Sequence, residues 1–82
     1  MPTIYITDPL GNTIRLTDER IDHIYNGHPS LYGRVDLVIE TVENPDMVRI
    51  HPNSPMTHNY FKEFDEENSR VRLRVAVISR RR

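Results

Sequence analysis

The chain has no cysteine and no tryptophan, and its charges nearly cancel. Without cysteine, disulfide bonds and thiolate metal sites are excluded, and a reducing, cytoplasmic location is expected. No apolar run approaches the roughly 20 residues that span a bilayer, and no basic-then-apolar signal peptide opens the sequence, so we expect no membrane association. The net charge of −1 disfavours nucleic-acid binding through bulk electrostatics.

The length and composition predict a single polar domain over residues 1–82. Hydrophobic side chains make up 37% of the chain and charged ones 28%, and either half alone would be too small to bury a core. The charges are unevenly distributed, since six of the eleven basic residues fall in Arg70–Arg82 and four acids fall in Glu63–Glu67. One face of the domain is therefore expected to be basic although the whole is not.

Alternating β-branched runs predict strands, and apolar residues at helical spacing predict two helices. In chain order we expect a hairpin of Thr3–Thr7 and Thr13–Leu16, a helix capped by Thr17, a helix with an apolar stripe from Val35 to Val42, a strand Met47–His51, a loop His51–His58, and strands Asn59–Asp65 and Arg70–Ile78. This order, ββ-α-α-βββ, predicts an α+β domain with both helices on one face of a small antiparallel sheet.

Two histidines in the segment ERIDHIYNGHP suggest acid–base chemistry. His23 falls inside the first expected helix, and His28 follows that helix directly before Pro29. Histidine titrates near neutral pH, so both side chains could act on a phosphodiester. The structural alternatives are a partly buried His23 that bonds the backbone and a His28 that fixes the turn between the helices.

The other two histidines, His51 and His58, bracket the expected loop. The spacing of the four matches no structural zinc pattern, and no acidic ligand is obviously placed beside them. We therefore expect neither a metal nor a cofactor.

Lys62 is a candidate phosphate ligand because it shares a strand face with two aromatic residues, Tyr60 and Phe64. Lys62 could hold a phosphate while Tyr60 stacks on a base or donates its hydroxyl. The alternative is an ordinary solvated lysine on an edge strand with common cross-strand neighbours.

Three arginines, Arg70, Arg72 and Arg74, alternate along the last expected strand. They are about 7 Å apart on one face, by the rise of a strand, and they are expected on the face that the helices leave open. A phosphate backbone would suit this row. The alternative is neutralisation across the hairpin by acids of Glu63–Glu67.

The ordered series LTDERIDHIYNGHP, VDLVIETVENPDMV, NYFKEF and VRLRVAVI resembles small phage and bacterial domains of the barnase/EndoU/colicin/RelE-like nuclease group, which share the BECR fold. The resemblance covers about residues 16–78. It implies an α+β fold and metal-independent cleavage of RNA. With the residue chemistry above, it gives an expected site of catalytic His23, His28, Lys62 and Arg74 and substrate-binding Tyr60, Arg70 and Arg72.

Members of that group continue beyond the valine-rich strand into a further strand of the type FIxTAY, whereas this sequence ends in Ser79–Arg82. The resemblance therefore implies that activity is lost, or that a second copy or another partner completes the sheet. Arg70–Ile78 would then be an exposed apolar edge, which pairs readily with another chain.

These patterns leave three functions open. The first is a metal-independent ribonuclease in which His23 is the general acid or base and the cations stabilise charge on the phosphate. The second is a catalytically inactive module that binds a protein partner or a second copy through the strand edge Arg70–Ile78. The third is an RNA-binding protein without catalysis.

Overall fold

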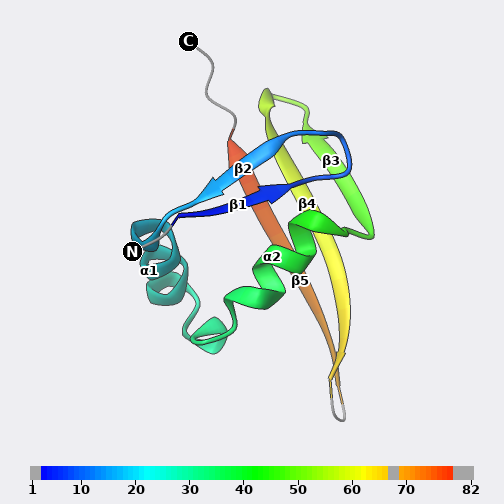
Figure 1. Ribbon diagram of the computed structural model, residues 1–82. Coiled ribbons are helices and arrows are strands. Elements are labelled where there is room, and N and C mark those ends of the chain that lie inside the picture. The colour runs from blue at the N-terminus through cyan, green and yellow to red at the C-terminus, as the bar shows by residue number, and fades with distance from the viewer. Residues whose placement is uncertain (1–2, 67–68, 79–82) are drawn as a thin grey trace.

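The structure, a computed structural model, describes residues 3–66 and 69–78. Its elements are β1 (Ile4–Thr7), β2 (Thr13–Leu16), α1 (Asp18–Gly27), a 3-10 helix η1 (Pro29–Leu31), α2 (Val35–Glu43), β3 (Met47–His51), β4 (Ser54–Glu66) and β5 (Ser69–Ile78) (Figure 1). The α+β class and the order ββ-α-α-βββ are confirmed. The described strands form two antiparallel sheets, one of β1 and β2 and one in which β4 lies between β3 and β5.

The start of α1 follows the sequence pattern. Thr17 precedes the helix with an extended backbone, and its Oγ1 accepts a hydrogen bond from the Arg20 N–H at 3.2 Å. Asp18 and Glu19 then lie in the first turn, where negative charge is favourable. Thr17 is therefore the helix cap that was predicted.

α2 crosses one face of the β3–β5 sheet, and the β1–β2 hairpin crosses the same face beside it (Figure 1). The predicted apolar stripe is confirmed, because Val38 and Val42 are buried and Val35 and Ile39 are half-buried. The central buried cluster draws on the hairpin, α2 and β4 and consists of Ile6, Leu16, Val42 and Tyr60. The core thus lies between this sheet face and the elements that cover it.

The predicted loop His51–His58 is wrong. β3 ends at His51, a tight turn follows, and β4 already begins at Ser54. The pairing shifts between Ile50 and His51, where Ile50 lies opposite His58 but His51 lies opposite Ser54. Pro55 falls within this irregularity, where an absent N–H costs little pairing, so the prolines did not prevent a strand.

The β3–β5 sheet has one covered and one open face. Tyr60, Val75 and Val77 point toward the core, whereas the alternate positions of β5 are all exposed. These exposed positions are Arg70, Arg72, Arg74, Ala76 and Ile78. The predicted placement of the three arginines on the open face is confirmed.

Within the described ranges, neither helix has the length and apolar character that a membrane crossing requires.

Candidate functional site

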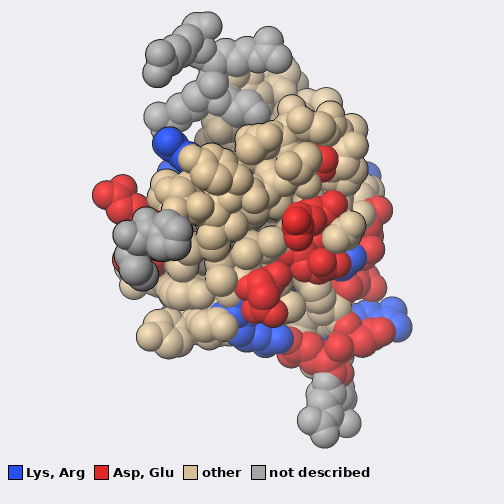
Figure 2. Space-filling view, in the orientation of Figure 1, with Lys and Arg blue, Asp and Glu red and all other residues tan. Residues whose placement is uncertain are grey.

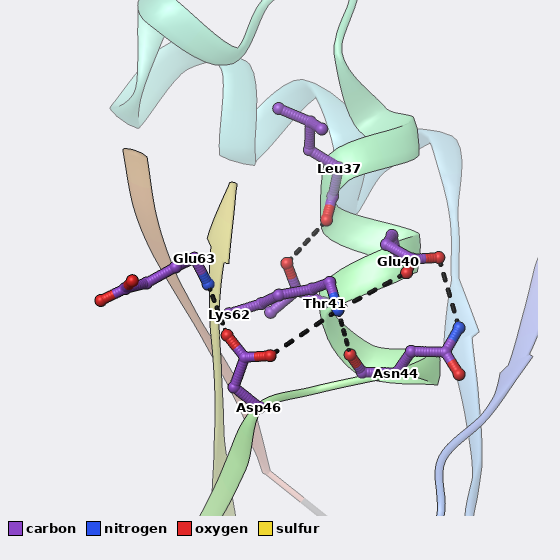
Figure 3. A network of polar contacts seen from close by, with 7 residues as sticks. All are labelled: Leu37, Glu40, Thr41, Asn44, Asp46, Lys62 and Glu63. Atoms are coloured by element: carbon purple, nitrogen blue, oxygen red, sulfur yellow. Dashed lines mark hydrogen bonds and ion pairs between the residues drawn. The ribbon is translucent and has the colours of Figure 1, made fainter. Parts of the chain in front are cut away.

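Lys62 is held against the C-terminal end of α2, on the covered face of the sheet (Figure 3). Its Nζ donates a hydrogen bond to the Asn44 carbonyl at 2.6 Å and lies 3.6 Å from Glu40 Oε2 and 3.9 Å from Asp46 Oδ1. Only 19% of the side chain is exposed. Because the C-terminal end of a helix carries partial negative charge, this ammonium group stabilises α2.

The residues after α2 are bonded to β4 on both sides of Lys62. The Asp46 N–H donates to the Phe61 carbonyl at 2.7 Å. Asp46 Oδ2 accepts a hydrogen bond from the Glu63 N–H at 2.8 Å (Figure 3). Pro45 prevents the helix from continuing, so the chain turns directly from α2 into β3. The NPD segment and the aromatic–lysine strand therefore form one structural junction.

Tyr60 is buried, with 1% of its surface exposed, so it has no free ring face for a nucleic-acid base. Its hydroxyl donates a hydrogen bond to Asp8 Oδ2 at the turn of the β1–β2 hairpin. Burial and this hydrogen bond together raise the pKa of Tyr60 above its usual range. Tyr60 therefore joins the hairpin to the three-stranded sheet.

Asp8 is also buried, with 4% of its surface exposed, and it organises the hairpin turn. Its Oδ1 accepts hydrogen bonds from the N–H groups of Leu10 at 3.0 Å and Asn12 at 2.7 Å, and Asn12 Nδ2 donates to Oδ2 at 3.0 Å. Burial alone would raise the pKa of Asp8, but the hydrogen bonds from Tyr60 and Asn12 outweigh it and hold the pKa below its ordinary value.

Two of the three arginines on β5 are paired with acids of β4. Arg70 lies opposite Asp65 and donates to its Oδ1 at 3.3 Å, and Arg72 lies opposite Glu63 and donates to its Oε1 at 2.9 Å. Neutralisation across the hairpin, the alternative to phosphate binding, thus applies to both. Glu67 and Ser79–Arg82 lie outside the described residues.

Arg74 differs from the other two arginines because its neighbour across the ladder is Phe61, which is uncharged. Its guanidinium makes no ion pair or hydrogen bond with any residue that the structure describes.

The histidines lie apart from these cations. His23 is exposed on α1, which does not fit the alternative of a partly buried imidazole, and it borders a depression of about 220 Å³ with Thr17, Glu19 and Arg20. His28 is exposed between α1 and η1. Its backbone N–H donates a hydrogen bond to the Ile24 carbonyl at 2.8 Å, and its carbonyl accepts one from the Leu31 N–H at 2.9 Å. The backbone of His28, and not its side chain, forms the turn.

The expected site residues are only partly brought together, because Lys62 and Arg72 line one depression and the other expected residues are not part of it. Lys62 lies between Tyr60 and Phe64 on the covered face, whereas Arg74 and its neighbouring arginines project from the open face. A depression of about 500 Å³ lies at the start of β3 and is lined by Asp46, Met47, Arg49, Phe61, Lys62, Glu63 and Arg72. Both acidic and basic side chains line it, so it is not a uniformly basic cleft. Among the described residues, no three histidine or acidic side chains gather as metal ligands.

Sequence reasoning missed Asp8 and Asp46, two acids that tie segments together through their side chains. Each had a local signal, because Asp8 precedes a Pro-Leu-Gly turn and Asp46 follows Asn-Pro at a helix end. Only the long-range partners, Tyr60 and the Glu63 N–H, were beyond the reach of local patterns.

No protein-family model, curated protein or solved structure matches the chain. The resemblance to the BECR-fold nuclease group therefore stays a prediction.

Proposed function

We propose that this domain is a protein-interaction module that accepts an additional β-strand along the outer edge of β5. The observation that carries the proposal is the position of β5, a ten-residue strand at one end of the sheet. Within residues 3–66 and 69–78, the only strand hydrogen-bonded to it is β4. The outer edge of such a strand presents a row of backbone N–H and C=O groups that can pair with another strand.

The sheet has two edge strands, β3 and β5, and their features favour β5 as the one that accepts an added strand. Native edge strands are commonly short, bulged or followed by proline, which discourages pairing. β3 has these features, with five residues, a register shift at Ile50 and His51, and Pro52 after it. β5 has ten residues, no proline and a register with β4 that runs without a shift from Ser69 to Ile78. Its charged residues, Arg70, Arg72 and Arg74, are the one such protection that it shares with native edge strands.

The apolar side chains of β5 also favour an added strand. Val71, Leu73, Val75 and Val77 form a half-buried row on the covered face, and Ile78 is 67% exposed on the other. A neighbouring strand would place its own side chains beside this row and remove apolar surface from water. Burial of that surface is the expected driving force for binding.

The ribonuclease alternative has less support from the geometry. Lys62, Arg70 and Arg72 are already engaged by carbonyl or carboxylate groups. Acidic side chains also gather over α2 on the side shown in Figure 2. Asp36 and Glu43 of α2, and Asp46 just after it, are exposed. A phosphate backbone would be repelled there. The prediction of RNA cleavage therefore rests on the sequence resemblance and on residue chemistry, without a site that gathers those residues.

Selection from a displayed random-peptide library tests the proposal. We expect peptides that bind the purified domain and slow hydrogen exchange at backbone amides of Arg72–Ile78. Tyr5→Ala, at an exposed position of the hairpin, is the matched control and should bind the same peptides equally well. The proposal fails if no peptide is selected, or if the selected peptides protect amides elsewhere and leave β5 unchanged.

A further inference from the structure

We propose that the strand accepted by β5 is β5 of a second copy, in an antiparallel register centred on Val75. This inference rests on the proposed function and adds the identity and the alignment of the partner. The resulting dimer would have one continuous sheet of six strands, in the order β3-β4-β5-β5-β4-β3.

Two-fold symmetry restricts the alignments that such a pair can adopt. In an isologous antiparallel pair, if residue i lies opposite residue j, then j also lies opposite i. A two-fold axis perpendicular to the sheet keeps the covered faces of both copies on one side. One residue of β5 must then lie opposite its own counterpart, and the choice of that residue defines the register.

The arginines of β5 distinguish these registers, because like charges directly opposite each other are unfavourable. An axis at Leu73 would place Arg72 opposite Arg74 of the second copy, twice by symmetry. An axis at Arg74 would place that side chain opposite itself. With the axis at Val75, Arg74 lies opposite Ala76 and Arg72 lies opposite Ile78, so no two arginines meet within Arg72–Ile78.

The same register matches the apolar row on the covered face. Val75 meets Val75 on the axis, and Leu73 lies opposite Val77 on each side of it. On the open face, the aliphatic stem of Arg72 would cover Ile78 of the second copy, which is 67% exposed in the single chain. The paired segment ends at Ile78, because one step further along this face Arg70 would lie opposite position 80, another arginine.

Register-specific cross-linking tests the alignment, and the absence of native cysteine makes every disulfide attributable. With the axis at Val75, the side chains of that residue in the two copies lie about 4.5–5.5 Å apart at Cβ, near the range that a disulfide bridges. We expect Val75→Cys to form a disulfide-linked dimer with a mild oxidant. Arg74→Cys is the matched control, and it should remain monomeric under denaturing conditions because its counterpart is diagonal to it.

A charge pair at Ala76 provides a second test that does not depend on a half-buried position. Ala76 is exposed and would face Arg74 of the second copy, twice by symmetry. We expect Ala76→Glu to lower the dimer Kd about tenfold and Ala76→Arg to raise it about tenfold, because opposite and like cross-strand charges have opposite effects. Sedimentation equilibrium of both variants and of the unaltered protein measures this.

The possible outcomes separate this inference from the proposed function. A dimer that cross-links through Val75→Cys and responds to charge at Ala76 supports both. A dimer that cross-links through Arg74→Cys instead overturns the register. A protein that stays monomeric at all concentrations overturns the second copy as partner, while peptide selection on β5 would still support strand addition. Failure of both experiments would overturn both proposals.

Discussion

At the scale of single residues, several side chains chosen for their chemistry lie in surroundings that differ from the expected ones. Tyr60 was expected to contact substrate, and it instead lies in the core with its hydroxyl bonded to Asp8. A tyrosine suits both roles, because it combines an apolar ring with a polar tip. Burial decides between them, and burial depends on the hairpin, which is about fifty residues away in sequence.

The hydrogen bond between Tyr60 and Asp8 is expected to stabilise the fold. Tyr60→Phe should lower the free energy of unfolding by about 1–3 kcal/mol, because it removes a donor from a carboxylate that stays buried. Urea unfolding at neutral pH measures the change. Tyr5→Phe removes a hydroxyl that is exposed, so its effect should stay within about 0.5 kcal/mol. Equal stabilities of the two variants would contradict a structural role for the bond.

The lowered pKa of Asp8 predicts how stability depends on pH. A carboxylate whose folded pKa is depressed adds stability above its unfolded pKa, about 3.9, and loses it as the pH falls through the folded value. The stability difference between the unaltered protein and Asp8→Asn should therefore be largest near neutral pH and shrink below about pH 4. Urea unfolding across the acid range checks this. A difference that does not change with pH would contradict it.

At the scale of the elements, hydrophobic periodicity predicted the helices and most strands, because each has one covered face. The α2 stripe and the alternation in β5 are the clearest cases. The extent of β4 was not predictable in this way, since its first residues include Pro55 and lie in an irregular pairing with β3. Strand pairing, and not local propensity, determines where β4 begins.

The junction between α2 and β4 gives a prediction at this scale. Lys62→Gln should lower the free energy of unfolding by about 1 kcal/mol, because the end of α2 loses a charged partner for its carbonyl. Arg74→Gln is the matched control on the same pair of strands, and it should change stability by less than about 0.5 kcal/mol. Thermal or urea unfolding compares the two variants. A larger loss for Arg74→Gln would contradict the assignment of Lys62 to the helix end.

At the scale of the whole molecule, the arrangement of faces determines what the charges can do. The sequence predicted a row of arginines on an open face, and that row is present. It could not predict that Lys62 would lie on the other face, because this depends on which side of the sheet α2 covers. The cations and the histidines expected to form one site are therefore divided between surfaces.

This division predicts that the domain does not cleave RNA. Unaltered protein and His23→Ala, both folded, should leave single-stranded and structured RNAs equally intact in the presence of a chelator. Binding to the same RNAs should be weak, since Arg70 and Arg72 are already paired with carboxylates. Gel analysis of labelled RNA measures cleavage. Cleavage by the unaltered protein that His23→Ala abolishes would restore the ribonuclease function.

The outer edge of β5 is the central claim, and backbone hydrogen exchange tests it most directly. In an antiparallel ladder successive residues point alternately to each neighbour, so every second amide of Arg72–Ile78 faces outward. We predict that these outward amides exchange rapidly at low protein concentration and become protected as the concentration rises, while the amides bonded to β4 stay protected throughout. Rapid exchange of the outward amides at every concentration would contradict pairing with a second copy. Rapid exchange that persists when a selected peptide is bound would contradict the central claim itself.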